Sequence, residues 1–321
     1  MEINFVQQVE FDSLNELEFD FIICSSGFES RATYAYLCLK DGLSKFNNKI
    51  CFSFQDRKEY SKAVNDLFFK ENGFELISIL SNDISFFTEI FHERFKSSDK
   101  HTITILFDYS CMTSIIYASI MKYFKECGSM EAVNIFFSYT HAEFTKATKS
   151  NPLFYNHPIP LFDPVQSTDK RVALLIGLGY EEDKALGLYE YFQNDGEDMY
   201  LFITKNIQFY AEVTKSNKHI LNITNKQNII HYDLENIPPL INTLDSLVNY
   251  LINTNYRVVI APIGPKVFNL VSLIINLYHA ELTTYRLSDG SKGIPIDKIA
   301  DKEKKPTVIQ LCMSNRVAED I

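Results

Sequence analysis

Short apolar runs alternate with longer amphipathic stretches along most of the chain. Runs such as residues 21–24 and 103–107 are continuously apolar, which is typical of strands buried on both faces of a sheet. The stretches between them, such as residues 84–96, carry apolar side chains every three or four positions, as amphipathic helices do. The pattern predicts the α/β class, with mainly parallel sheets that are covered by helices on both faces.

This alternation occurs twice. Residues 21–29 form an apolar run that ends in Gly-Phe-Glu, and residues 173–181 form a similar run that ends in Gly-Tyr-Glu. The later strands expected in the two halves follow in the same register: 50–54 and 201–204, 76–80 and 229–233, 103–107 and 257–261, 133–138 and 282–287. The chain is therefore predicted to form two tandem Rossmann-like units that arise from internal duplication, each with five strands in a doubly wound, mainly parallel sheet.

The boundaries of these units follow from composition. We expect the first unit at residues 1–150 and the second at 171–321, joined by a connector at 151–170 that contains several prolines and asparagines. A last apolar stretch, residues 307–312, is expected to add a strand to the second sheet. The charged residues 297–305 before it are expected to form a solvated loop.

Charge and composition narrow the class of partner. The chain has 41 acidic and 31 basic side chains, a formal net charge of −10, which disfavours long nucleic acids because their binding needs a concentrated basic face. No apolar stretch is long enough for a membrane span and the N-terminus does not resemble a signal peptide, so we expect a cytoplasmic protein without a membrane partner. The six cysteines and seven histidines lack metal-ligand spacing, so reduced thiols and no metal site are expected.

Ligands of open α/β sheets bind beyond the carboxyl ends of the strands, where the strand order reverses. This rule selects the loops after the first and fourth strands, which in the first unit contain Gly27, Glu29, Arg31, Asp108 and Ser110. Backbone N–H groups near Gly27 and the Arg31 guanidinium are expected to bind a phosphate, with Ser110 as a further contact. Glu29 and Asp108 are expected to bind ribose hydroxyls or to act as catalytic carboxylates.

Each of these residues also has an ordinary structural explanation. Gly27 suits a tight turn, Glu29 and Arg31 suit the surface of a first helical turn, and Asp108 suits a helix cap. Ser110 and Cys111 are of nucleophile type, but no motif places a histidine beside them, and a nucleophile needs a positioned base.

The corresponding loops of the second unit contain Gly179, Gly264 and Lys266. The Gly-x-Gly that includes Gly179 is an incomplete dinucleotide fingerprint, because Glu182 stands where the third glycine would be. Pro265 is a favourable helix start, whereas a lysine in the first helical turn opposes the helix dipole. An anionic ligand would explain Lys266, and backbone contacts near Gly179 and Gly264 are expected to assist.

Two fused Rossmann-like units with ligand loops after strands one and four, the second carrying Gly264-Pro265-Lys266, resemble the CARF and SAVED sensory domains of prokaryotic antiviral defence. In that family the loop after strand four often carries a Gly-Thr-Lys-like motif, and paired units bind a cyclic oligonucleotide in the cleft between them. Here Pro265 replaces the hydroxyl residue, and the first unit has no lysine at the equivalent place. The resemblance implies a nucleotide sensor and leaves two alternatives: the effector is another polypeptide, or the chain itself is the enzyme.

Three hypotheses result. The first is a protein that binds a nucleotide or another phosphorylated small molecule, including a cyclic oligonucleotide, in a cleft between the two units, as part of an antiviral defence system. The second is a hydrolase or transferase that acts on a nucleotide at the same cleft. The third is a structural subunit of a multi-protein defence complex. The sequence identifies no cofactor.

Overall fold

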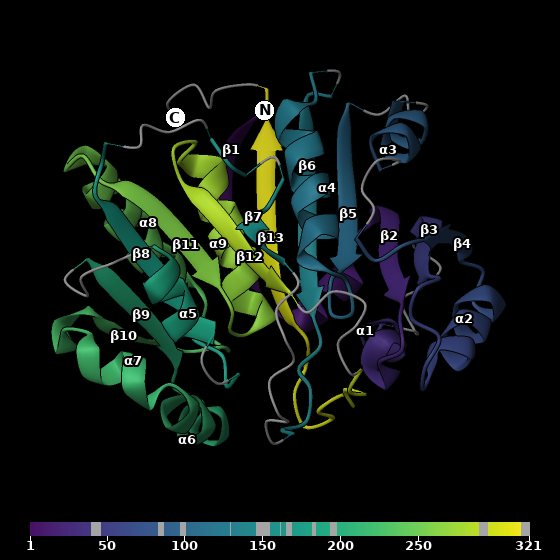
Figure 1. Cartoon of the computed structure of the whole chain (residues 1–321). Coiled ribbons are helices and arrows are strands. Elements are labelled where there is room, and N and C mark those ends of the chain that lie inside the picture. The colour runs from purple at the N-terminus through teal and green to yellow at the C-terminus, as the bar shows by residue number, and fades with distance from the viewer. Residues whose placement is uncertain are drawn as a thin grey trace. The chain divides into compact units, whose positions relative to one another are not determined.

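The computed structural model of the chain describes residues 1–39, 46–82, 87–96, 101–128, 130–145, 155–160, 162–164, 169–181, 184–192, 198–288 and 295–315. The chain forms two compact units, unit 1 (Met1–Glu143 and Pro295–Ile321) and unit 2 (Phe144–Ile294) (Figure 1). Each unit contains one mixed, mostly parallel sheet, so the predicted α/β class is confirmed. Within the described residues, no helix combines the length and the apolar character that crossing a bilayer requires.

Unit 1 contains a seven-stranded sheet in the order β1-β13-β6-β5-β2-β3-β4. The strands from β6 to β4 in this order are parallel, and β13 and β1 add an antiparallel edge. Its strands are β1 (Glu2–Val9), β2 (Phe19–Ser26), β3 (Phe46–Phe54), β4 (Glu75–Ile79), β5 (Thr102–Asp108), β6 (Ala132–Tyr139) and β13 (Thr307–Ser314). Its helices are η1 (Phe11–Glu16), η2 (Ser30–Thr33), α1 (Tyr34–Cys38), α2 (Lys62–Glu71), α3 (Phe87–Lys96) and α4 (Ser114–Glu126).

Helices cover both faces of this sheet. All eight residues of β2 are buried, as its continuous apolar run predicts. One face packs against η1, α1 and α2, which contribute Leu14, Tyr36 and Phe69 to the core. The other face packs against α3, where the Phe91 ring lies 6.2 Å from the ring of Phe52 in β3. Burying each such side chain contributes about 1.5–3 kcal/mol.

Unit 2 contains a six-stranded sheet in the order β10-β9-β8-β11-β12-β7, in which only β7 is antiparallel to its neighbour. Its strands are β7 (Tyr155–Pro158), β8 (Val172–Gly177), β9 (Met199–Thr204), β10 (Ile229–Tyr232), β11 (Arg257–Pro262) and β12 (Thr283–Ser288). Its helices are α5 (Lys184–Tyr191), α6 (Ile207–Ser216), α7 (Lys218–Ile223), η4 (Lys226–Asn228), α8 (Pro238–Asn253) and α9 (Lys266–Tyr278).

The five parallel strands of each unit have the same order. Taken along the chain, they lie as third, second, first, fourth and fifth, which is β4-β3-β2-β5-β6 in unit 1 and β10-β9-β8-β11-β12 in unit 2. The strand order therefore reverses between β2 and β5 in unit 1 and between β8 and β11 in unit 2. The loops at the carboxyl ends of these four strands are the ones that the sequence analysis selects as ligand loops. Internal duplication itself stays a prediction.

The last strand does not lie where the sequence predicts. The prediction that residues 307–312 join the second sheet is wrong, because β13 lies between β1 and β6 of unit 1 and is antiparallel to both. Seven of its eight positions are buried, and such a strand needs a neighbour on each side. In unit 2 the place beside β12 is taken by β7.

The boundaries of the units shift accordingly. β7 lies inside the connector expected at 151–170 and forms an edge of the unit 2 sheet, where a proline such as Pro158 is tolerated. Unit 2 ends at Ile294 instead of running to residue 321, and the C-terminal residues belong to unit 1. The two sheets thus have seven and six strands instead of five each.

Candidate functional site

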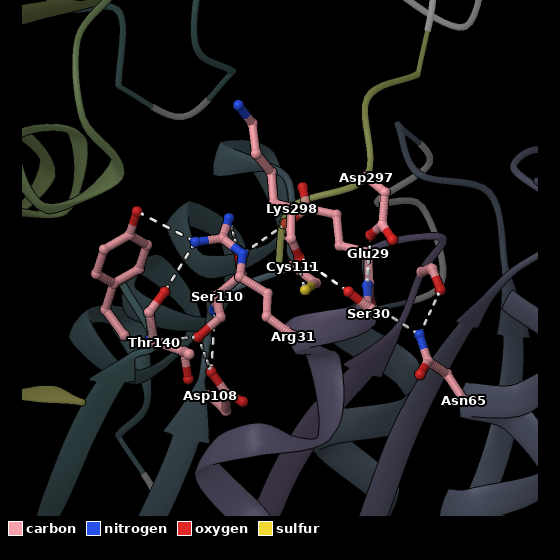
Figure 2. Close-up of polar contacts among 12 residues, drawn as sticks. Glu29, Ser30, Arg31, Asn65, Asp108, Ser110, Cys111, Thr140, Asp297 and Lys298 are labelled. Atoms are coloured by element: carbon pink, nitrogen blue, oxygen red, sulfur yellow. Dashed lines mark hydrogen bonds and ion pairs between the residues drawn. The ribbon is translucent and has the colours of Figure 1, made fainter. Parts of the chain in front are cut away.

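Arg31 lies at the centre of the polar contacts at the carboxyl end of the unit 1 sheet (Figure 2). It belongs to η2, which follows β2, and its side chain is only 4% exposed. Nε donates to Glu29 Oε2 at 2.6 Å, and Nη2 donates to the carbonyl of Ser110 at 3.0 Å. Nη1 donates to the carbonyl of Thr140 at 2.8 Å and to the Tyr139 hydroxyl at 3.3 Å. One guanidinium therefore connects the loops that follow β2, β5 and β6.

The charge of Arg31 is compensated within the protein. Burial opposes this charge, but attraction by Glu29 and Tyr139 outweighs burial and holds the pKa of the guanidinium well above its ordinary value. The expectation that Arg31 clamps a phosphate does not fit this geometry, because its donors point at four protein acceptors. Arg31 instead positions Glu29 and the surrounding loops.

Asp108 also belongs to the internal frame. It is 4% exposed, and its Oδ1 accepts hydrogen bonds from the backbone N–H of Ser110 at 3.0 Å and from the Ser110 hydroxyl. The Ser110 Oγ in turn accepts a hydrogen bond from the backbone N–H of Thr140 at 2.8 Å. Figure 2 shows Asp108 beneath Ser110. Direct contact of Asp108 or Ser110 with a ligand does not fit this burial; both side chains hold the loop after β5 against β6.

Glu29 and Cys111 form a more exposed layer beside this frame. The Glu29 side chain is 16% exposed, and Cys111 is half-buried. The Cys111 thiol lies 3.7 Å from Glu29 Oε2, the oxygen that also accepts from Arg31. A carboxylate has about four acceptor positions. Glu29 is thus a carboxylate fixed by a buried cation and partly open to solvent, which suits it to bind hydroxyl groups.

The segment before β13 lies against the same edge. Asp297 Oδ1 accepts a hydrogen bond from the backbone N–H of Ser30 at 2.7 Å, and the carbonyl of Lys298 accepts from the backbone N–H of Arg31 at 3.2 Å. The prediction that residues 297–305 form a solvated loop is therefore wrong for its first residues. Sequence reasoning missed this contact because Ser30 and Asp297 lie 267 positions apart, and no local sequence pattern indicates such a pairing.

An asparagine fixes the loop after the first parallel strand in each unit. In unit 1, Asn65 Nδ2 donates to the carbonyl of Gly27 at 3.0 Å. In unit 2, Asn217 Nδ2 donates to the carbonyl of Gly179 at 2.7 Å. Both asparagines follow their glycine by 38 residues. Sequence reasoning missed them, and this equal spacing is the signal that could have found them.

A second buried cation lies at the carboxyl end of β3. Lys62 is 5% exposed, and its Nζ donates to the hydroxyl of Ser53 at 2.8 Å and forms an ion pair with Asp66. Ser53 also donates to Asp66 Oδ1 at 2.9 Å. Burial alone would raise the pKa of Asp66, but the hydrogen bonds from Lys62 and Ser53 outweigh it and hold this pKa below its ordinary value.

The glycines of unit 2 allow two loops to touch. A Cβ placed on Gly179 would lie 2.5 Å from the carbonyl oxygen of Ile263, and one on Gly264 would lie 2.6 Å from that of Leu178. These distances are far below van der Waals contact, so both positions require glycine for packing. Gly27 differs, because a Cβ there would meet only side-chain atoms, the nearest at 3.4 Å in Phe54.

The charged residues of the unit 2 loops are arranged differently from those of unit 1. Lys184 is 8% exposed and forms an ion pair with Glu181, which has the place that Glu29 has in unit 1. Lys266 is the first residue of α9 and is half-buried, so it lies at the helix entry, as its sequence position predicts. Glu182, where the fingerprint lacks its third glycine, lies outside the described residues.

Several hydroxyls at the carboxyl end of the unit 1 sheet are buried without a hydrogen-bond partner in the described part of the chain. They belong to Ser25, Ser138 and Thr140. Leaving a buried hydroxyl without a partner costs about 1–3 kcal/mol. These hydroxyls add to the polar character of this edge.

The structure distributes the predicted site residues over both units. It brings Gly27, Glu29, Arg31, Asp108 and Ser110 together in unit 1, and Gly179, Gly264 and Lys266 lie on adjoining loops of unit 2. Among the described residues, no three His, Cys, Asp or Glu side chains gather in a way that suits a metal ion.

Comparison with models of protein families, with curated proteins and with solved structures gives no match for this chain. The geometry of the site therefore carries the functional inference.

Proposed function

We propose that unit 1 binds a nucleotide or another phosphorylated small molecule at the carboxyl ends of β2 and β5. The observation that carries the proposal is Glu29, a partly exposed carboxylate where the strand order reverses, held by the buried Arg31 at 2.6 Å. Because Arg31 already holds the carboxylate in place, Glu29 can accept hydrogen bonds from the paired hydroxyls of a ribose with little further loss of side-chain entropy.

Two basic residues lie in segments that contact the loop after β2. Figure 2 shows the Lys298 side chain extending away from Asp108, and Arg57 lies over the ring of Phe28, 5.8 Å from its centroid. Lys298 and Arg57 are both half-buried. Charge-assisted hydrogen bonds to phosphate are the stronger kind, so we propose these two residues as the phosphate contacts, which the net charge of −10 does not exclude.

The test compares a ribonucleotide with its deoxy form. AMP and 2′-deoxy-AMP are titrated by calorimetry into the wild-type protein, Glu29→Gln and the surface control Glu75→Gln. We expect AMP to bind the wild type and the control about tenfold more tightly than 2′-deoxy-AMP, because a hydrogen bond to a charged group contributes about 1.5–3 kcal/mol. Glu29→Gln should remove this difference. Equal affinity of all three proteins for both ligands would contradict the proposal.

The resemblance to CARF and SAVED domains extends this proposal to a sensor in antiviral defence, with a cyclic oligonucleotide as ligand, a separately encoded effector and a cytoplasmic location. Thermal-shift titration with cyclic oligoadenylates tests the extension. A sensor should bind them at least tenfold more tightly than AMP, and Lys266→Ala should weaken this binding if Lys266 contacts a phosphate in unit 2.

An enzyme at the same site is the second candidate, and the pairing of Cys111 with Glu29 favours it. A thiol 3.7 Å from a fixed carboxylate resembles a nucleophile beside a base, and Glu29 alone could stabilise positive charge that develops on a ribose during cleavage of a glycosidic bond. Chromatography of nucleotides incubated with the protein tests this candidate. Turnover that is unchanged in Glu29→Gln and Cys111→Ser would exclude these residues from catalysis.

A further inference from the structure

Tyr60 has an unusual backbone and an unusually exposed ring. Its φ is +45°, in the left-handed region that bulky residues seldom adopt, and 61% of the residue is exposed. Holding a residue in such a conformation costs of order 1–3 kcal/mol and is found mostly where the conformation serves a function. The ring is too exposed for core packing to explain a tyrosine at this position, and glycine would adopt this backbone conformation more easily.

The surrounding contacts hold this ring beside Phe28. The Tyr60 ring centroid lies 6.2 Å from that of Phe28, with 48° between the ring planes, and the Tyr60 hydroxyl donates to the carbonyl of Pro295 at 3.1 Å. The backbone N–H of Ser61 donates to the carbonyl of Phe28 at 3.2 Å. Asn65 holds the carbonyls on either side of Phe28, those of Gly27 and Glu29, at 3.0 and 2.9 Å. Hydrogen bonds thus hold the backbone on both sides of Phe28 and the hydroxyl of Tyr60.

An aromatic pair at the corresponding loop of unit 2 is stacked. There Tyr180, the residue after Gly179, stacks on Phe209 with 6.3 Å between centroids and only 18° between planes. The edge of the Phe144 ring packs against Phe209 at 5.4 Å. All three of these residues are half-buried. The two rings of unit 1 are splayed instead of stacked, and one of them is exposed.

We propose that Phe28, Tyr60 and Arg57 form a platform on which the base of a nucleotide stacks. The inference rests on the proposed function of unit 1 and restricts its ligand class to nucleotides. Aromatic faces bind nucleobases by stacking, and the Arg57 guanidinium over the Phe28 ring adds a cation–π contribution. Phe28 immediately precedes Glu29, so the platform and the carboxylate that the proposed function assigns to ribose hydroxyls belong to the same loop after β2.

The test separates the base from the sugar and the phosphate. AMP, GMP, CMP, UMP and ribose 5-phosphate are titrated by calorimetry into the wild type, into Tyr60→Ala and into the control Tyr250→Ala, which removes a tyrosine that is 60% exposed on α8 of unit 2. We expect Tyr60→Ala to weaken nucleotide binding about 5- to 100-fold, the range typical of losing one stacking partner. Binding of ribose 5-phosphate should not change, and Tyr250→Ala should bind all ligands as the wild type does.

A fluorescence measurement locates the base directly. The chain contains no tryptophan, so Tyr60→Trp introduces a single indole at the platform. AMP should quench its emission, and ribose 5-phosphate should not.

The outcomes distinguish the platform from the proposed function. If ribose 5-phosphate binds as tightly as AMP and Tyr60→Ala changes neither affinity, the platform is wrong while phosphate-sugar binding in unit 1 stands. If none of the five compounds binds the wild type, the proposed function and the platform fall together.

Discussion

The guanidinium of Arg31 donates a 2.8 Å hydrogen bond to the carbonyl of Thr140, a residue 109 positions further along the chain. The same side chain reaches the carbonyl of Ser110 at 3.0 Å and the carboxylate of Glu29 at 2.6 Å. Three loops that leave three parallel strands therefore share one buried cation. The carboxyl edge of unit 1 consists of an internal frame around Arg31, with Glu29 at its partly exposed rim.

Because of these contacts, we predict that Arg31 stabilises the folded protein even when no ligand is bound. Arg31→Ala should lower the free energy of unfolding by about 3–5 kcal/mol, because it leaves buried acceptors and the Glu29 charge unpaired. Arg31→Lys keeps the charge but lacks the planar fork, so it should cost about 1–3 kcal/mol. Urea unfolding followed by circular dichroism measures both.

Arg94→Ala serves as the control for this pair of variants. Arg94 forms an ion pair with Glu75 on the surface, where its side chain is 32% exposed, so its loss should cost less than about 1 kcal/mol. If Arg31→Ala is as stable as Arg94→Ala, the buried frame does not stabilise the edge as described.

A second prediction concerns the touching loops of unit 2. Gly264→Ala should destabilise the protein by about 1–3 kcal/mol or more, because its Cβ would lie 2.6 Å from a backbone carbonyl oxygen that cannot move alone. Gly27→Ala is the matched control and should stay within about 1 kcal/mol of the wild type, since only a side chain must adjust and φ is not positive. Thermal and urea unfolding of the two variants, compared side by side, test the difference.

The fold was predictable where local pattern decides it. The apolar runs at 21–24 and 103–107 become β2 and β5, and these strands alone locate the edge at which the order reverses. β13 could not be assigned to its sheet from the sequence, because its position depends on which strand has a free edge in the folded protein. In unit 2, β7 occupies the edge beside β12, and β13 instead pairs with β6 and β1 of unit 1. β1 was not predicted, since its exposure alternates irregularly and no continuous apolar run marks it.

The location of the candidate site was predictable from the sequence, but the roles of its residues were not. A charged residue in the turn after a strand, such as Arg31, suggests an exposed ligand contact when only its neighbours are known. Its burial depends on acceptors at Ser110 and Thr140, which are 79 and 109 residues away. Tyr60 was not predicted as a site residue either, because the sequence around it indicates neither its positive φ nor its exposure.

A third prediction concerns acid. The pKa of Asp66 is lowered in the folded protein, so Asp66 contributes stability above its unfolded value of about 4, and this contribution is lost as pH falls through the lower folded value. Asp66→Asn should therefore be less stable than the wild type at pH 7, and the difference should shrink by pH 3. Urea unfolding at both pH values measures it. A difference that does not change with pH would mean that the ionised carboxylate is not what Lys62 and Ser53 stabilise.

The last prediction uses the backbone of Tyr60 to separate stability from binding. Tyr60→Gly and Tyr60→Ala remove the same ring, but glycine adopts the φ of +45° without the steric cost that alanine retains, so the glycine variant should be more stable than the alanine variant by about 1 kcal/mol. Both variants should bind AMP equally weakly, because binding depends on the ring. Urea unfolding and calorimetry on the same preparations measure the two properties. Equal stabilities would show that the left-handed backbone at Tyr60 stores no strain, and weaker nucleotide binding by the glycine variant alone would show that chain flexibility, and not the lost ring, controls affinity.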